Sequence, residues 1–438
     1  MTAATTRRGR VRPGHALGRR GAVLGVLAAL TVASAGCTTT ADPGTQPAAE
    51  AAGATALPPL PTEPGQPGGA PLIDAEAPGR VVPEAPGRVV PGASGSSTEA
   101  GDRDQDRNQK DEDEEDEKVD DDEPGMTAPT AFPAWMARPA GDRGLCPAPT
   151  VRVRTAEQLQ KALDDAGPGT VIRMEPGVYQ GSFVVTGSGA AGDEAVLCGD
   201  ADAILNGDGY RGDYVLHLDG AQHWVLSGFT VRNGQKGVMA DGTTGTTISG
   251  LTVYGIGDEA IHLRRHSTDN LVADNTISDT GLRKPKFGEG VYVGSANSNW
   301  GDLTDGEPDR SDRNHVTGNA IYATTSESVD IKEGTTGGVL AGNQFDGSLI
   351  TGADSWVDVK GNDWTVADNV GRHSPLDGFQ THDVADGWGT RNTFTANRGE
   401  LRSGEGFLIA LRPENENVAR CDNALLTDVG GLSNKDCR

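Results

Sequence analysis

The sequence predicts an all-β fold, a right-handed parallel β-helix of about ten coils with an N-terminal capping helix, over residues 146–438. Three observations support this prediction. Short β-branched runs alternate with Gly, Asn, Asp and Thr throughout this part of the chain. Apolar five-residue segments recur at intervals of roughly 22 to 28 residues, with longer gaps where loops are inserted. An amphipathic helix pattern of the kind that covers the open end of a solenoid precedes them.

Residues 1–37 are typical of an export signal. Six arginines precede an apolar stretch at 21–32, which is too short to span a bilayer comfortably, and small residues at 33–36 follow it. Cys37 then stands as in a bacterial lipobox, so we expect a lipid-anchored protein, with an ordinary secretory signal as the alternative. Arg19 and Arg20 leave Sec and Tat export both open. In either case the expected location is outside the cytoplasm, with membrane contact only through the lipid.

Residues 38–145 are expected to be a disordered linker. The first part is rich in Pro and Gly and contains a tandem duplication, 76–83 and 84–91, and an acidic run follows at 102–123. An acidic tail that binds cations or a partner is the alternative. The formal net charge of −25 argues against nucleic acid as a partner, because phosphate binding needs Lys and Arg. We expect a monomer.

The four remaining cysteines lie at the two ends of the predicted domain and allow three pairings. We expect disulfides Cys146–Cys198 and Cys421–Cys437, because each would staple one end. A metal site is not expected, since no short C-x-x-C pair is present and the compartment is oxidising.

The capping helix is expected over residues 156–166. Thr155 is a suitable N-cap, Leu159 and Leu163 fall on one face, and Gly167-Pro168-Gly169 ends the helix.

Eight repeat segments define the coils, and in nearly all of them the second and fourth residues are aliphatic, so these two positions are expected to point inward. The segments are 215–219, 237–241, 260–264, 290–294, 328–332, 356–360, 378–382 and 406–410. A second and a third short strand follow each segment, which gives three strands per coil. Asn275, Asn319 and Asn343 are expected to stack at turns in a structural role.

The capping helix, the segment Gly177-Val178-Tyr179 and the repeat at 225–234 (VLSGFTVRNG) resemble the pectate-lyase superfamily of parallel β-helix proteins. The resemblance covers about residues 150–438. It implies the fold more than the activity, because lyases, hydrolases, epimerases and phage tailspikes share this scaffold.

The outward positions of the repeat segments carry the candidate site. The third positions are His217, Met239, His262, Tyr292, Asp330, Asp358, Gln380 and Leu408, and the fifth are Asp219, Asp241, Arg264, Gly294, Lys332, Lys360, His382 and Ala410. Successive coils are ~4.8 Å apart, so the middle coils present one polar patch. The patch is expected to fade at Met239 and at Leu408 with Ala410.

The resemblance implies a polysaccharide lyase that cleaves a uronic-acid polymer by β-elimination. In this interpretation Lys332 or Lys360 is the base, and Arg264 or the other lysine neutralises the substrate carboxylate. The candidate acids are Tyr292, His262 and His382. The candidate ligands of a calcium ion are Glu289, Glu327, Asp330 and Asp358.

Two inserted loops are expected to flank the patch and to bind substrate. Lys284 and Lys286 in the first would meet an anionic sugar chain. Trp300 in the second would stack on a sugar ring, and Trp356 and Trp388 would line the same groove. Gln380 on the sheet is also expected to bind substrate. Two other functions remain open: a glycoside hydrolase that uses Asp330 and Asp358, and a non-catalytic carbohydrate-binding or adhesion solenoid.

Overall fold

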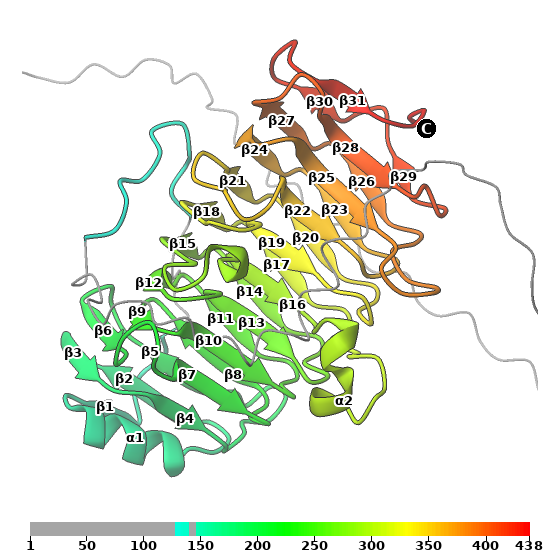
Figure 1. Cartoon of the computed structure of the whole chain (residues 1–438). Coiled ribbons are helices and arrows are strands. Elements are labelled where there is room, and N and C mark those ends of the chain that lie inside the picture. Colours follow the sequence, from blue (N-terminus) through cyan, green and yellow to red (C-terminus); the bar gives the residue numbers. More distant parts are fainter. Residues whose placement is uncertain (1–127, 140–145) are drawn as a thin grey trace, which may run out of the picture. The chain divides into compact units, whose positions relative to one another are not determined.

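The computed structural model describes residues 128–139 and 146–438, and the second range folds into a parallel β-helix (Figure 1). Each coil contributes one strand to each of three sheets, and neighbouring strands in every sheet are parallel. The predicted right-handed β-helix of about ten coils is confirmed. The expected export signal, Cys37, the tandem duplication and the acidic run lie outside the described residues. Among the helices that the structure describes, none is long and apolar enough to cross a membrane.

Sheet I contains the repeat segments that the sequence aligned. Its ten strands stack in the order β4, β7, β10, β13, β16, β19, β22, β25, β28, β31. Their bounds are Phe183–Val185, Tyr214–Asp219, Lys236–Asp241, Ile261–Arg264, Val291–Val293, Val329–Ile331, Ser355–Val359, Asp377–His382, Phe407–Arg412 and Gly431–Ser433.

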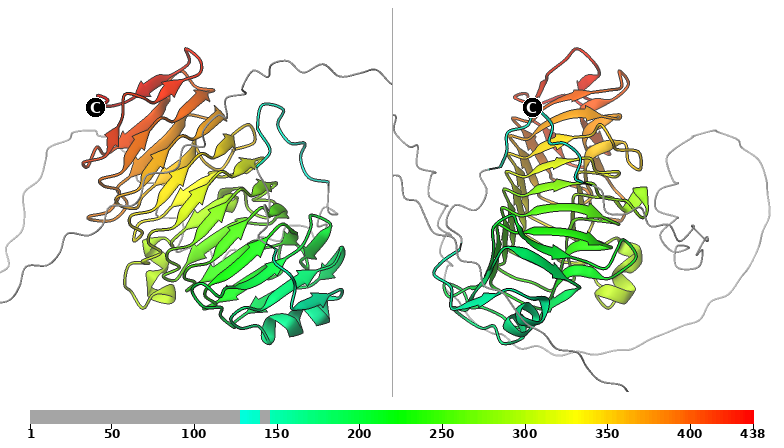
Figure 2. Two further views of the ribbon diagram at one scale, coloured as in Figure 1. Left: turned by 180° about the vertical axis from the view of Figure 1, so that it is seen from behind. Right: turned by 90° about the vertical axis from the view of Figure 1, so that its left-hand side faces the viewer.

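Sheets II and III complete each coil, and the stacked layers are seen edge-on in Figure 2. Sheet II comprises β1 (Val151–Val153), β2 (Val171–Met174), β5 (Ala195–Cys198), β8 (Trp224–Ser227), β11 (Thr247–Ser249), β14 (Leu271–Ala273), β17 (His315–Thr317), β20 (Val339–Ala341), β23 (Thr365–Ala367), β26 (Thr393–Thr395) and β29 (Val418–Ala419). Sheet III comprises β3 (Gly177–Gln180), β6 (Ala203–Asn206), β9 (Thr230–Gly234), β12 (Thr252–Ile256), β15 (Thr276–Ser278), β18 (Ala320–Tyr322), β21 (Gln344–Asp346), β24 (Val370–Ser374), β27 (Arg398–Leu401) and β30 (Ala424–Leu425).

The N-terminal end of the solenoid is covered by α1 (Ala156–Asp164). The Thr155 side chain accepts a hydrogen bond from the backbone N–H of Gln158, and Leu159 and Leu163 are fully buried against the first coil. The structure contains the disulfides Cys146–Cys198 and Cys421–Cys437, the pairing expected from the sequence. One disulfide therefore lies at each end of the domain.

Buried asparagines form a ladder at the turn between sheets II and III. The side-chain N–H of Asn275 donates to Asn319, and the same contact repeats from Asn319 to Asn343 at 3.0 Å. The ladder continues through Asn369, Asn397 and Asn423. Each member also donates to a backbone carbonyl on the preceding coil, as Asn319 does to Val272 on β14. The structural role expected for this column agrees with these contacts, since each amide satisfies buried backbone groups.

The last described part of the expected linker, residues 128–139, packs on the outer face of sheet III. The Trp135 indole N–H donates to Asp346 at 2.7 Å, and Phe132 and Met136 contact Tyr322 and its neighbours. This segment therefore packs on the solenoid, although it belongs to the linker expected over residues 38–145. The Pro-rich composition suggested a linker throughout, but Phe132 and Trp135 bury apolar surface against the solenoid.

The register of β28 corrects the predicted end of the outward columns. Gln380 lies beside Ala410 and His382 lies beside Arg412, so the third and fifth positions of this coil are Ala410 and Arg412. The sequence alignment was wrong by two residues because Phe407–Leu411 is apolar throughout. A two-residue shift keeps every side chain on the same face, so alternation could not reveal it.

Candidate active site

The outward face of sheet I brings the predicted residues of the middle coils into two adjacent columns. In the first column Tyr292, Asp330, Asp358 and Gln380 are successive register partners on β16, β19, β22 and β25. The second column lies two residues further along the same strands. Its members are Lys332, Lys360, His382 and Arg412, which we call the cation column.

Ion pairs tie the two columns together. The Lys332 ammonium lies 2.9 Å from Asp330 Oδ2, and the Lys360 ammonium lies 3.1 Å from Asp330 Oδ1 and 2.8 Å from Asp358 Oδ2. On the next coil His382 Nδ1 lies 3.0 Å from Asp358. Asp330 and Asp358 are each only 2 % exposed, so the carboxylates form a buried floor beneath the cations.

This network holds both lysines in the charged form. Burial alone would lower their pKa values, but the adjacent carboxylates reverse the effect, and the pKa values of Lys332 and Lys360 rise well above the ordinary range. The charge of Lys332 does act to lower the pKa of Lys360, but Asp330 and Asp358 outweigh this effect. His382 and Lys360 lower the pKa of Asp358 although burial opposes the shift, while Asp358 raises the pKa of His382.

Tyr292 lies on β16, the coil that precedes Lys332 in the solenoid. Its ring centroid is 5.1 Å from the Lys332 ammonium and 4.3 Å from the His262 ring. Burial raises the pKa of the Tyr292 phenol, and the charge of Lys332 acts in the opposite direction. His262 Nε2 contacts the Gly294 carbonyl at 2.9 Å, so Nε2 is the protonated nitrogen. Burial keeps the pKa of His262 well below its usual value, and this imidazole is neutral.

Three carboxylates gather where the strands of sheet I begin. Glu289, Glu327 and Asp330 bring one oxygen each within 4.8 Å of one another. Burial raises the pKa of Glu289 well above its usual value, with Glu259 adding repulsion, and raises that of Glu327 to about 7, with Asp330 adding repulsion. One oxygen of Glu289 is buried without a hydrogen-bond partner among the described residues. Burial and mutual repulsion therefore favour the protonated forms of Glu289 and Glu327.

These carboxylates fit a calcium ion poorly. Calcium takes about six to eight oxygen ligands, but Asp358, the fourth expected ligand, is outside the cluster and is held by Lys360 and His382. Both oxygens of Asp330 already contact lysine ammonium groups, which an incoming dication would have to displace. The cluster predicted as a metal site is present, and its chemistry favours protons.

Arg264 lies away from the lysines. It is on β13, and its guanidinium donates to Asp241 at 2.7 Å and to the Tyr214 hydroxyl at 3.2 Å. His217 contacts the same Asp241 at 3.0 Å. The polar surface therefore extends one coil beyond Met239, where the sequence had predicted that it would fade.

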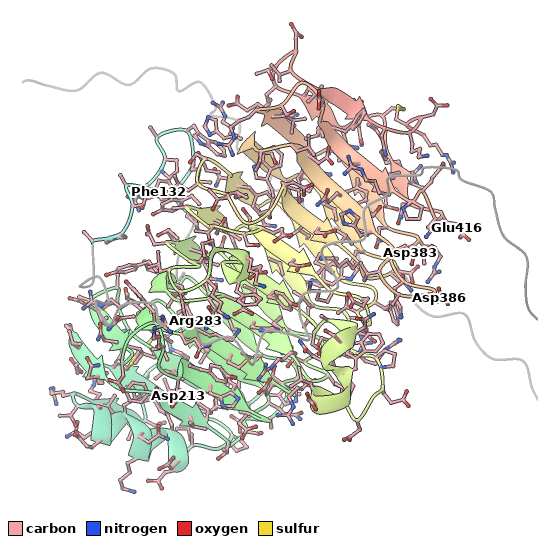
Figure 3. The ribbon with its side chains drawn as sticks, viewed as in Figure 1. Phe132, Asp213, Arg283, Asp383, Asp386 and Glu416 are labelled. Carbon is pink, nitrogen blue, oxygen red and sulfur yellow. A yellow bond between two sulfur atoms is a disulfide. The ribbon has the colours of Figure 1, made fainter. Side chains whose placement is uncertain are left out.

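The two predicted loops precede and follow β16, so they lie at opposite ends of the strands of sheet I. Lys284 and Lys286 precede β16 and contact the ring of Phe287. Trp300 begins α2 (Trp300–Leu303), which projects beyond the C-terminal end of β16 (Figure 1), and its indole N–H donates to the Ser295 carbonyl. Figure 3 shows Arg283 on the side of the first loop and Asp383 with Asp386 on the side of the second.

The second loop also contacts the loop that follows β25. Arg310 of the second loop lies over Trp388, with its guanidinium carbon 5.6 Å from the ring centroid.

Trp356 is in the core and does not line the substrate face. It is fully buried, its indole N–H donates to the Arg372 carbonyl, and it packs edge-on against Phe379. Gly371 and Gly399 make room for the ring, because a Cβ at either position would lie 2.6 Å from it.

Two residues of the face, Arg412 and Asp354, were missed from the sequence. Arg412 donates through Nη1 to Asp377 and to Gln380, and the Gln380 amide donates to Asp354 at 2.7 Å. Asp377 was recognised from the sequence as a carboxylate that directly precedes a repeat segment. Arg412 was hidden by the register error, and Asp354 lies outside the repeat.

Comparison with known proteins identifies the chain. The structure superposes on an alginate lyase from Paenibacillus sp. str. FPU-7 with a TM-score of 0.62 and 32 % sequence identity, over 66 % of this chain and 99 % of the other. A pectate lyase, Pel9A, matches with a TM-score of 0.48 at 12 % identity, over 66 % of this chain and 79 % of the other. A polygalacturonase from Erwinia carotovora ssp. carotovora matches with a TM-score of 0.39 at 12 % identity, over 71 % of this chain and 99 % of the other.

No family model matches the sequence, and no curated protein matches it. The identity to the Paenibacillus enzyme nevertheless extends over that whole chain. The protein therefore belongs to the same family as this alginate lyase, and it is a lyase-like enzyme with a parallel β-helix fold.

Proposed function

We propose that the protein cleaves a uronic-acid polymer by β-elimination and that alginate is the first substrate to test. The observation that carries the proposal is the contact of the Lys332 ammonium with the Tyr292 ring on the outward face of sheet I. It supports the proposal because the positive charge of Lys332 lies beside a phenol, a group that is able to transfer protons. The 32 % identity to an alginate lyase supports the choice of substrate.

The reaction makes three demands on the site. The carboxylate of the reacting sugar must be neutralised, the C5 proton must be removed, and the oxygen that leaves C4 must receive a proton. The C5–H electron pair then forms the C4=C5 bond while the C4–O bond breaks. The charged Lys332 and Lys360 suit the first demand, because an ammonium stabilises the negative charge that develops on the carboxylate in the transition state. Glu327 lies close enough to Lys360 for the lysine charge to lower its pKa, and in its protonated form it would add a hydrogen-bond donor.

Proton removal falls to Tyr292 in this proposal. The raised lysine pKa values oppose a lysine base, which was the role expected from the resemblance. Burial raises the pKa of Tyr292 too, but the adjacent Lys332 charge opposes this shift and favours the phenolate, whereas the carboxylates beside the lysines oppose loss of an ammonium proton. The phenolate would take the C5 proton, and the phenol so formed, or the Lys332 ammonium, would give a proton to the leaving oxygen. Neutral His262 packs against the Tyr292 ring and restricts its orientation.

A lysine base remains the alternative assignment, and one experiment separates the two. Lys332→Arg keeps the positive charge but cannot act as a base near neutral pH. If Tyr292 is the base, Lys332→Arg retains a measurable part of the activity that Lys332→Ala loses. If Lys332 is the base, both variants are equally inactive.

The hydrolase interpretation is less well supported by the geometry. A general acid must hold a proton, but Lys360 and His382 keep Asp358 ionised and both oxygens of Asp330 contact ammonium groups. A non-catalytic role does not suit a chain of this enzyme family.

The test of function is the product. Incubation with alginate, pectate, glucuronan and a glycosaminoglycan should generate the ultraviolet absorbance of an unsaturated uronate with at least one polymer. New reducing ends without that absorbance would indicate hydrolysis, and binding of a polymer without either signal would contradict catalysis.

We also propose that the protein acts outside the cytoplasm as a monomer, held by lipid at Cys37. The two disulfides support the compartment, because such bonds persist in oxidising surroundings. Labelling with a radioactive fatty acid, with Cys37→Ser as the control, tests the anchor.

A further inference from the structure

The cation column continues beyond the residues assigned to the reaction. His382 and Arg412 are register partners on β25 and β28, and Lys332 and Lys360 directly follow β19 and β22 in the same column. One basic side chain therefore follows another every ~4.8 Å along the solenoid. The reaction as proposed uses only the first two. His382 and Arg412 lie on the next two coils toward the C-terminus.

Each basic group is fixed by acceptors beneath it. His382 is held by Asp358, and Arg412 is held by Asp377 and Gln380. Asp377 is fully buried, and it also accepts a hydrogen bond from the Phe407 backbone N–H at 2.7 Å. Both basic groups are therefore set in position before a ligand arrives, which reduces the entropy lost on binding.

Access to ligand increases along the column. The side chains of Lys332 and Lys360 are 11 % and 10 % exposed, whereas those of His382 and Arg412 are 22 % and 33 % exposed. Among the described residues, Arg412 makes both of its side-chain hydrogen bonds through Nη1. A guanidinium presents five N–H donors in a planar fork that matches a carboxylate, so a second, outward-facing pair of donors is suited to an anionic ligand.

We propose that His382 and Arg412 form a second subsite that binds the carboxylate of a neighbouring uronate unit, on the C-terminal side of the reacting sugar. This inference rests on the proposed function, because it takes the polymer to lie along the columns of sheet I. The arrangement makes the enzyme prefer oligomers long enough to reach β25 and β28.

The direct test is a comparison of uronate oligomers of increasing length, of the polymer that the wild-type protein degrades. Arg412→Gln should raise KM for long oligomers roughly ten-fold, since a hydrogen bond to a charged group contributes about this much or more. It should change kcat less than about two-fold and leave KM for the shortest cleaved oligomer unchanged. His382→Asn should act in the same direction, and Arg412→Lys should recover part of the loss by restoring the charge.

The matched control is Arg391→Gln, which removes another arginine that is ion-paired with an aspartate, Asp363, outside sheet I. It should leave KM unchanged for every oligomer. Because Arg412→Gln also leaves buried Asp377 without its arginine, the melting temperature of each variant is measured alongside. Wild-type KM values for long oligomers in a folded Arg412→Gln protein, or equal increases for short and long ones, would overturn the subsite.

The inference and the proposed function fail separately. If no polymer is cleaved, binding of long alginate oligomers is measured by calorimetry with the wild-type, Arg412→Gln and Arg391→Gln proteins. Affinity that drops only in Arg412→Gln would keep the subsite while the lyase is rejected. Equal affinity in all three proteins, or no binding, would reject the subsite.

Discussion

The Lys360 ammonium bridges Asp330 and Asp358, which lie on neighbouring coils, at distances of 3.1 Å and 2.8 Å. It is the only described side chain that contacts both carboxylates by ion pairs of 4.0 Å or less. Of these two carboxylates, Lys332 contacts only Asp330. The two lysines are therefore not equivalent: Lys360 joins two coils, and Lys332 faces Tyr292.

This difference predicts different effects of the two alanine variants. Lys332→Ala and Lys360→Ala should each reduce kcat by at least about 100-fold, because both remove charge at the developing enolate. Only Lys360→Ala should also lower the free energy of unfolding substantially, by about 3 kcal/mol, because it leaves two buried carboxylates close together with less compensation. Steady-state kinetics and urea denaturation measure the two effects. Full activity in both variants would reject the lyase site.

Much of this site could be predicted because successive side chains of a β-strand point to opposite faces of the sheet. Once the repeat segments were aligned, the alternation placed Asp330 and Lys332 outward and put Tyr292 and Asp358 in the same column. Arg412 could not be placed, because an apolar run contains no register signal. Trp356 was misplaced because the space for its ring is made by Gly371 and Gly399 on sheet III, which no local pattern connects with it. The charge states also required distances, since burial and pairing shift the lysine pKa values in opposite directions.

Tyr292→Phe tests the proton-transfer role directly. The substitution removes only the hydroxyl, and the ring still packs on His262 and beneath Lys332. We expect kcat to fall about 100-fold or more with KM little changed, since general acid–base groups contribute this much. Steady-state kinetics on the best polymer measure it. A Tyr292→Phe protein that keeps wild-type kcat would assign proton removal to another group, with Lys332 next in order.

Glu327 predicts how stability depends on pH. Its folded-state pKa of about 7 exceeds the ordinary value of 4.5, so the folded protein binds more protons than the unfolded chain between these values. The free energy of unfolding should therefore fall as pH rises through this window. Glu327→Gln should remove roughly 2 kcal/mol of that loss.

Thermal unfolding of the wild-type and Glu327→Gln proteins on both sides of this window measures the effect. Glu405→Gln is the matched control, because Glu405 also precedes a strand of sheet I but is exposed. The prediction fails if both variants show the wild-type dependence on pH.

Chelation tests the calcium expectation apart from the lyase itself. Because the Glu289, Glu327 and Asp330 cluster favours protons and Asp330 is held by lysines, dialysis against EDTA should leave the activity unchanged. The polymer should be one that does not itself gel with calcium. Activity that disappears on dialysis and returns with calcium would show that the ion displaces a lysine from Asp330.

The segment 128–139 should stabilise the β-helix without affecting catalysis. Trp135 is half-buried, its indole N–H donates to Asp346, and Arg372 lies over its ring with its guanidinium carbon 5.1 Å from the centroid. All of these contacts are on sheet III, while the candidate site is on sheet I. Trp135→Ala should lower the free energy of unfolding by about 1–3 kcal/mol, because it exposes apolar surface and removes one of the hydrogen-bond donors to Asp346, which keeps those from Ser348 and His373.

Urea denaturation and lyase kinetics should be measured on Trp135→Ala beside Val178→Ala, a control that removes an apolar side chain which is 55 % exposed. We expect a lower denaturation midpoint for Trp135→Ala alone, with an unchanged slope and unchanged kcat and KM in both variants. An unchanged midpoint would mean that the packing of this segment contributes nothing measurable to folding. A change in KM would instead connect sheet III with substrate binding, because no described contact of Trp135 reaches sheet I.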